Sequence, residues 1–255
     1  MATDEPQRVQ AVEHSIAMLE ALVSTDGATL ADLDERLGVS KSTIYHHLET
    51  LRAHGLVEKR DGEYDLGYGL LALGGYLRDR SKLFQFARPV VDSVADETGE
   101  FVALAVEHRL QSVHAYRVEG EQALPTDSYL GVHLDLHAAA SGKALLANLG
   151  DEAVDRYVDE HGLRRYTDDT ITDRDALFEE LETVREQGYA TEDVERIEGL
   201  RSVSVPVMDR GTEEVLGSVA IAGPTNRIKG ERFREEYPDL LQRNVNMLEV
   251  KLTYS

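Results

Sequence analysis

The chain has 255 residues, a length that suits two domains better than one, and 42% of them are hydrophobic, enough to form buried cores. It contains no cysteine, which excludes disulfides, a thiolate nucleophile and cysteine-ligated zinc. No apolar run approaches the roughly 18 residues that predict a membrane span. The opening segment MATDEPQRVQ is polar and lacks the apolar core of a signal peptide. We therefore expect a cytoplasmic protein with no membrane association.

The charge balance is strongly acidic, with 48 Asp and Glu against 27 Lys and Arg, a formal net charge of -21. Of the 27 basic residues, six are lysine and 21 are arginine, and the acidic residues are spread along the whole chain. At about 1 M salt the Debye length is only ~3 Å, so the repulsion within such a surface is screened. This composition predicts a protein from a salt-loving organism, the alternative being a mesophilic protein that is simply acidic.

Residues 9–66 contain three helical patterns. Apolar residues at helical spacing predict the buried face of a first helix: Val12, Ile16, Leu19 and Val23. Thr29 and Asp32 form a capping-box pattern that opens a second helix, and Ser40 is a favourable N-cap for a third. The short turn between these two helices contains Gly38, which is typical of a helix-turn-helix.

A hairpin is expected next, because Asp61-Gly62 favours a two-residue turn. A helix-turn-helix followed by a hairpin predicts a winged helix, whose third helix enters the major groove of double-stranded DNA. The candidate DNA contacts lie on the open face of that helix or near the tip of the wing: Lys41, Ser42, Thr43, Tyr45, His46, Lys59 and Arg60.

These candidates have different chemical roles. Lys41 is expected at a phosphate, Ser42 and Thr43 at phosphates or base edges, and Tyr45 and His46 at bases. We leave His47 out, since it could pack sideways against the wing.

A linker helix is expected over residues 67–87. Leu70, Leu73 and Leu77 form an apolar stripe larger than a connector requires, which indicates a surface for a second copy of the chain. Such pairing would supply the two-fold symmetry that half-site recognition uses. The alternative is a helix packed on its own domain.

Residues 88–255 show mixed patterns that predict one α+β domain. Strands are expected at 101–108, 112–120, 200–209 and 214–223, with a further extended piece at 128–136. Helices are expected at 89–98, from about Ser141, and at 152–161, 172–187 and 230–252.

The segment HAAASGKA resembles a phosphate-binding loop but lacks its first glycine and has Ala144 where a Ser or Thr would hold magnesium. Ser141 and Lys143 do not form a nucleophile and base, because they point to different faces of a helix start. The nine histidines form no metal-binding motif. We expect no catalytic residues, no metal and no cofactor.

Backbone N–H groups at the start of the Ser141 helix predict an anion site. Polar side chains that could face it lie on nearby strands and loops: Glu192, Asp193, Ser202 and Ser204. This combination is typical of a small-molecule sensor.

From Val9 to Lys251 the chain resembles the IclR family of transcriptional regulators. The resemblance rests on motifs that occur in order: LGVSKSTIYHHLETL, GLVEK, YDLGYGLLALG, DETGEFVAL, HAAASGKALLANL, RYTDDTITD, EQGYATEDVE, GLRSVSVPV and VAIAGPTNRI. It implies a winged helix over residues 1–66, a linker helix over 67–87 and a GAF-like effector-binding domain over 88–255.

The resemblance further implies a homodimer or homotetramer that binds an operator, as a repressor or activator of a catabolic pathway, and responds to a sugar acid or organic acid. By match to the family, the effector would contact Ala138, Ala139, Ser141, Gly142, Glu192, Ser202, Ala220 and Ala222. The family often has cysteine where Ser202 and Ala138 stand, serines where Ala220 and Ala222 stand, and arginine where His46 stands. The effector and operator are therefore not transferable from known members.

Two other classes stay open from the sequence: an architectural DNA-binding protein without a ligand, and an enzyme built on the second domain.

Overall fold

The computed structural model describes residues 8–123 and 128–254. The chain divides into two compact units, Met1–Arg80 and Ser81–Ser255, and we treat each separately. The division lies inside the segment expected as the linker, and the domain boundaries after residues 66 and 87 stay predictions.

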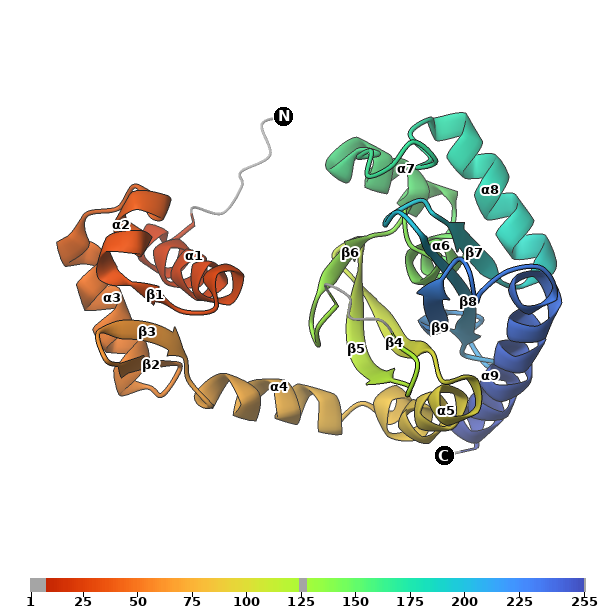
Figure 1. Cartoon of the computed structure of the whole chain (residues 1–255), viewed down its shortest axis with the longest axis horizontal. Coiled ribbons are helices and arrows are strands. Elements are labelled where there is room, and N and C mark those ends of the chain that lie inside the picture. The colour runs from red at the N-terminus through yellow and green to blue at the C-terminus, as the bar shows by residue number, and fades with distance from the viewer. Residues whose placement is uncertain (1–7, 124–127, 255) are drawn as a thin grey trace. The chain divides into compact units, whose positions relative to one another are not determined.

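The first unit contains three helices, a small antiparallel sheet and a fourth helix. Its elements are α1 (Gln10–Thr25), β1 (Ala28–Thr29), α2 (Leu30–Leu37), α3 (Lys41–Ala53), β2 (Val57–Arg60), β3 (Glu63–Leu66) and α4 (Gly69–Asp79). The strand order is β1-β3-β2, so the hairpin gains a third, two-residue strand that the sequence patterns did not indicate. The helix-turn-helix and the wing are confirmed (Figure 1).

Local sequence signals explain where these helices begin. The Thr29 hydroxyl accepts from the Asp32 amide at 3.3 Å, and the Asp32 carboxylate accepts from the Thr29 amide at 2.9 Å. The Ser40 hydroxyl accepts from the Thr43 amide at 3.3 Å. Each contact satisfies an amide at a helix start that has no partner within the helix.

The buried face predicted for α1 is wrong at three of its four residues, while the fourth, Leu19, is partly buried and packs against the core. Val12, Ile16 and Val23 are exposed, and the residues that α1 buries are Met18, Ala21 and Leu22. Two apolar stripes with helical spacing run along this helix, and the one that packs against Ile44 and Leu48 of α3 forms the core of the unit. Tertiary packing therefore selects the face.

The second unit contains one six-stranded antiparallel sheet with helices on both faces, which confirms the α+β class (Figure 1). Its elements are α5 (Lys82–Thr98), β4 (Phe101–His108), β5 (Gln111–Glu119), β6 (His133–Asp135), α6 (Ala140–Leu146), α7 (Asp151–His161), α8 (Arg174–Gln187), β7 (Ala190–Asp193), β8 (Leu200–Met208), β9 (Val215–Pro224), the π-helical turn η1 (Arg232–Glu236) and α9 (Tyr237–Thr253). The strand order is β6-β5-β4-β9-β8-β7.

Three expectations for this unit are corrected. The helix expected from residue 89 begins at Lys82, because Ser81 caps it and accepts from the Phe84 amide at 3.3 Å. Of the extended piece at 128–136, only His133–Asp135 pairs as a strand. The edge strand Ala190–Asp193 had no strand pattern of its own and exists through its pairing with β8.

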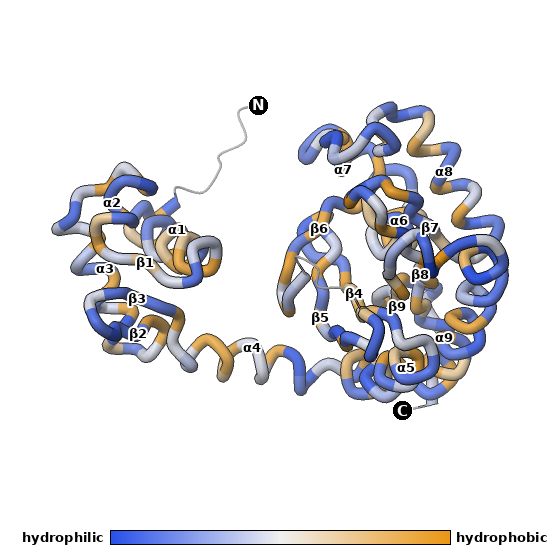
Figure 2. Tube along the Cα trace, viewed as in Figure 1, coloured by the Kyte–Doolittle hydropathy of each residue, from blue (hydrophilic) through white to orange (hydrophobic). Residues whose placement is uncertain are grey.

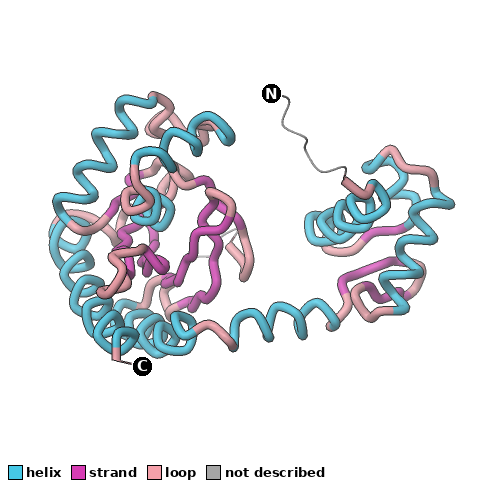
Figure 3. The backbone as a smooth tube through the Cα atoms, turned by 180° about the vertical axis from the view of Figure 1, so that it is seen from behind, coloured by secondary structure: helices cyan, strands magenta, loops and turns pink. Residues whose placement is uncertain are grey.

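Alternating residues of the central strands serve the two faces of the sheet. One face carries Val102, Leu104, Val203, Val205, Val219 and Ile221, which pack in a single core with α5 and α9. The other face carries serines, alanines and Phe101 and is covered in part by α6, as the two opposite views show (Figures 1 and 3). A period of two residues thus gives β8 and β9 one apolar and one mixed face.

Candidate functional site

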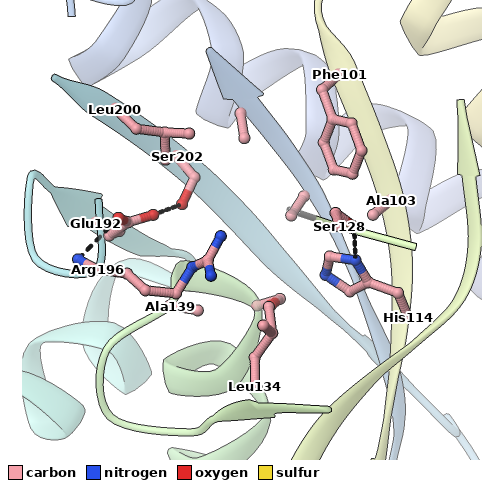
Figure 4. Close-up of a pocket in the computed structure, with 13 residues that line it drawn as sticks. Phe101, Ala103, His114, Ser128, Leu134, Ala139, Glu192, Arg196, Leu200 and Ser202 are labelled. Carbon is pink, nitrogen blue, oxygen red and sulfur yellow. Dashed lines mark hydrogen bonds between the residues drawn. The ribbon is translucent and has the colours of Figure 1, made fainter. Parts of the chain in front are cut away.

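A cavity lies between the mixed face of the sheet and the start of α6 (Figure 4). The empty volume among its lining residues is about 430 Å³, and this figure includes space that is open to solvent. Its lining comes from all six strands of the sheet, the start of α6 and two loops: Phe101, Ala103, His114, Ser128, Leu134, Ala139, Ser141, Glu192, Arg196, Leu200, Ser202, Ala220 and Ala222.

Strand register explains how residues distant in sequence meet on the wall of this cavity. Glu192 pairs with Ser202, Ser202 with Ala222, and Ala222 with Phe101, so one row crosses four strands. The neighbouring row places Ala220 beside Ala103. The small side chains on β9 leave room that a larger residue would fill.

One end of the cavity is built around a buried carboxylate. The Ser202 hydroxyl donates to Glu192 Oε2 at 2.6 Å, and the Arg196 amide donates to Glu192 Oε1 at 3.2 Å. Burial, only partly offset by these hydrogen bonds, raises the pKa of Glu192 to about 7. Figure 4 shows the Arg196 side chain extending into the cavity beside this carboxylate.

The other end is formed by His114 and Ser128, whose imidazole Nδ1 and hydroxyl lie 2.7 Å apart. The Phe101 ring lies 6.0 Å from the imidazole, centroid to centroid. An irregularity in the β4–β5 register between Leu104 and Ala105 turns His114 to this face. Such a bulge re-aims a side chain without any strong local sequence signal.

Behind the cavity, Lys143 forms a buried ion cluster. Its ammonium lies 2.8 Å from a carboxylate oxygen of Glu195 and 2.8 Å from one of Glu180. Burial raises the pKa of Glu195, and the charge and hydrogen bonds of Lys143 oppose that rise. The Ser141 hydroxyl instead lies 3.2 Å from that of Ser112, so Ser141 and Lys143 belong to separate networks.

Of the eight residues predicted to contact an effector, six line the cavity: Ala139, Ser141, Glu192, Ser202, Ala220 and Ala222. Ala138 and Gly142 are buried but do not line it. A Cβ at Gly142 would lie 2.5 Å from the Leu136 carbonyl oxygen, so close packing explains this glycine.

Two polar residues considered for the same site lie elsewhere. Asp193 is exposed and forms an ion pair with Arg201 at 2.6 Å. The Ser204 hydroxyl donates to the Val219 carbonyl at 3.2 Å within the sheet.

Seven lining residues were missed: Phe101, Ala103, His114, Ser128, Leu134, Arg196 and Leu200. Phe101 and Ala103 could have been found from alternation along their strand. His114 depends on the bulge, and Arg196 depends on a loop conformation that no periodicity predicts.

The open face of α3 carries the predicted DNA contacts. Lys41, Ser42, Tyr45 and His46 are exposed. Thr43 is half-buried, and its hydroxyl lies 2.9 Å from that of Ser40.

At the wing, Lys59 and Arg60 are exposed and each has a local partner. The Lys59 ammonium lies 4.6 Å from the Tyr64 ring centroid, and Arg60 pairs with Glu58 at 2.6 Å. Exposed pairs of this kind exchange readily with other partners such as phosphates.

His47, which we leave out of the DNA contacts, packs against α1. Its Nδ1 lies 2.7 Å from the Ser15 hydroxyl of α1, and its ring makes an edge contact with His14 at 5.9 Å. His47 therefore fixes α3 on α1.

Within residues 8–123 and 128–254, no three His, Asp or Glu side chains gather where they could bind a metal ion. None of the described helices combines the length and apolar character needed to cross a bilayer.

A winged helix with an exposed third helix, and a separate sheet unit with a partly polar cavity, together define the class of ligand-responsive DNA-binding regulators. Comparisons with known proteins agree. Residues 76–248 match the model of the bacterial transcriptional regulator IclR C-terminal domain, and residues 13–60 match a helix-turn-helix domain. The chain belongs to the IclR family of transcriptional regulators, which confirms the resemblance noted above.

Among curated relatives, the probable HTH-type transcriptional regulator ArcR of Halobacterium salinarum is 33% identical over 97% of this chain and 95% of its own length. The regulator KdgR of Escherichia coli is 30% identical, with 98% and 95% covered. The crystal structure of the Thermotoga maritima IclR superimposes with a TM-score of 0.79 at 30% identity, with 97% and 100% covered. An IclR homologue from Microbacterium hydrocarbonoxydans, solved in complex with 4-hydroxybenzoate, has a TM-score of 0.83 at 24% identity, with 96% and 100% covered, and shows the shared fold. The chain is thus a transcriptional regulator and not an enzyme.

Proposed function

We propose that this regulator binds an operator through α3 and the wing, and that a small organic acid or sugar acid in the cavity of the second unit changes its operator affinity, as a repressor or as an activator. It acts in the cytoplasm of a salt-loving organism. The observation that carries the proposal is one cavity that combines the Arg196 cation with buried hydroxyl groups. A planar guanidinium is suited to binding a carboxylate with two hydrogen bonds.

The lining fits a small acid rather than a large apolar ligand. Serine hydroxyls at positions 128, 141 and 202 can bind oxygen atoms, while Phe101 and Leu134 can cover a carbon skeleton. The related protein solved with 4-hydroxybenzoate makes that acid a rational first probe.

We propose a homodimer or homotetramer, supported by α4. This helix buries none of its residues within the chain, and it exposes Leu71, Leu73, Tyr76 and Leu77. Figure 2 shows hydrophobic residues along it. An exposed apolar stripe on a helix is typical of an interface with a second copy.

The DNA contacts are tested with the double variant Lys41→Ala and Arg60→Ala. Loss of two phosphate contacts should weaken binding to all DNA sequences alike and reduce the slope of log K against log salt by about 2. Fluorescence anisotropy with an operator selected from random DNA measures both. The control, Lys229→Ala with Arg243→Ala, removes the same charge from exposed positions of the second unit. Equal slopes in both variants would exclude these contacts.

The cavity is tested with Ser202→Leu, which fills the row beside Ala222. A thermal-shift screen of the unchanged protein first identifies acids that raise its Tm, because a ligand that binds the folded state stabilises it. In Ser202→Leu we expect operator binding to stay intact, while the acid no longer raises the Tm or changes the operator affinity. Thr212→Leu on an exposed turn is the control. A normal response in Ser202→Leu would place the ligand elsewhere. If no acid changes the Tm or the operator affinity of the unchanged protein or of Thr212→Leu, an architectural DNA-binding protein without a ligand is favoured.

A further inference from the structure

The buried carboxylate of Glu192 is an unusual feature for a cavity that takes an acid. The residue is 2% exposed, and both of its oxygens accept hydrogen bonds, from Ser202 and from the Arg196 amide. A ligand carboxylate that reaches Arg196 must therefore enter a space that already holds a negative charge.

The charges around Glu192 do not offset a second anion. Arg196 supplies one positive charge, and Lys143 of α6 is already paired with Glu195 and Glu180. Among the described residues, other charged or titratable groups on the elements around the cavity are Glu195 on the loop of Arg196 and the exposed pair Asp193 and Arg201 at the ends of β7 and β8. On β5 they are His114 and Arg117, whose guanidinium carbon lies 5.4 Å from the Phe101 ring centroid and which pairs with Glu119. Two buried carboxylates sharing one cation repel each other strongly in a medium of low dielectric.

A single proton removes this conflict. Neutral Glu192 can donate its O–H to a ligand carboxylate oxygen, while its other oxygen still accepts from Ser202 or from the Arg196 amide. The ligand carboxylate then no longer faces a negative charge on Glu192. Similar pairs of carboxyl groups share one proton wherever both cannot ionise.

We propose that the ligand's carboxylate binds only when Glu192 is neutral. Binding then takes up one proton from solvent wherever Glu192 is ionised in the free protein, and the regulator responds to its effector more strongly as the pH falls toward neutral. The inference rests on the acid ligand proposed above and adds its regulation by pH.

The direction follows from linkage. Because burial raises the pKa of Glu192 to about 7 in the free protein, the residue is mostly neutral below that pH. A bound anion raises this pKa further. Ligand affinity should be constant below about pH 7 and should fall about tenfold per pH unit above it, until the pH reaches the pKa of the complex.

The experiment is isothermal titration of the full-length protein with pyruvate, glycolate, benzoate and 4-hydroxybenzoate between about pH 6 and pH 8.5. At about pH 8, each titration is repeated in buffers of different ionisation enthalpy. The slope of the observed binding heat against that enthalpy gives the number of protons taken up. The variant Glu192→Gln keeps the shape of the neutral carboxyl group. We expect it to bind the same acid with an affinity that no longer depends on pH and without proton uptake.

The matched control is Asp193→Asn, the same loss of charge one residue along the strand on an exposed side chain. It should keep the slope and the proton uptake of the unchanged protein. A slope that survives in Glu192→Gln would assign the proton to another group such as His114 and overturn the proposal. A binding heat at about pH 8 that is the same in all buffers would show that the unchanged protein takes up no proton. This result would overturn the proposal regardless of the behaviour of Glu192→Gln.

If none of the four acids binds at about pH 6, the inference fails together with the acid ligand. The operator titration of Lys41→Ala with Arg60→Ala does not depend on any ligand, so it tests the DNA-binding function separately.

Discussion

At the scale of single residues, Lys143 shows what the burial of a charged side chain requires. Its side chain is 1% exposed and its ammonium contacts two carboxylates from different parts of the second unit. Glu195 belongs to the loop that carries Arg196, and its backbone carbonyl accepts from the Thr170 hydroxyl at 2.6 Å. Lys143 thus holds α6 and this loop together, and both contribute to the wall of the cavity.

Lys143→Met should destabilise the protein by about 3–5 kcal/mol, because it leaves buried carboxylate charge without its partner. Urea denaturation followed by circular dichroism measures the change. Lys229→Met, the same substitution at an exposed lysine, should change stability by less than about 0.5 kcal/mol. Equal stability of the two variants would show that the ion cluster contributes nothing.

At the scale of elements, α4 is a helix with no buried residue among those that the structure describes. Gly69 begins it with its amide donating to the Gly55 carbonyl at 2.9 Å. Beyond that contact the helix buries no residue, although its stripe is as apolar as that of a core helix.

We expect the double variant Leu73→Glu and Leu77→Glu to lower the oligomeric state, because it places like charges across any symmetric interface that contains these residues. Light scattering after gel filtration measures the mass, and circular dichroism checks that the fold is kept. Lys229→Glu, which places the same side chain at an exposed lysine outside α4, is the control and should leave the mass unchanged. An unchanged mass in the leucine variant would exclude α4 from the interface.

The sequence predicts the elements of this protein better than the faces they bury. Capping at Thr29 and Ser40 and the turn at Asp61-Gly62 are local signals, so the winged helix could be predicted closely. The face of α1 could not, because two stripes compete and only packing against α3 decides between them.

The cavity shows the same limit. Ser202, Ala220 and Ala222 could be placed from strand alternation and family likeness. His114 and Arg196 could not, since a bulge and a loop conformation bring them to the cavity. The missed residues provide much of its charge and ring chemistry, so the ligand class is harder to predict than the position of the site.

At the scale of the whole molecule, the net charge of -21 should make stability depend on salt. Self-repulsion opposes the compact state until ions screen it. Raising KCl from about 0.1 M to about 2 M should raise the Tm by several degrees, corresponding to a gain of about 1–2 kcal/mol. Thermal unfolding followed by circular dichroism measures this.

Sucrose of equal osmolality is the control, because it stabilises proteins through exclusion from the surface without screening charge. An equal rise in sucrose, or a Tm that falls in KCl, would contradict a role for charge screening.

The division of β8 and β9 into two faces has a consequence for how this protein can evolve. The valines at 203, 205 and 219 hold the core with α5 and α9, while Ser202, Ala220 and Ala222 on the same two strands line the cavity. A change at Ser202, Ala220 or Ala222 alters what the cavity accepts and leaves the packing on the opposite face intact. Duplicated copies of such a gene can therefore change the lining of this cavity by single substitutions, without first accumulating compensating changes in the core.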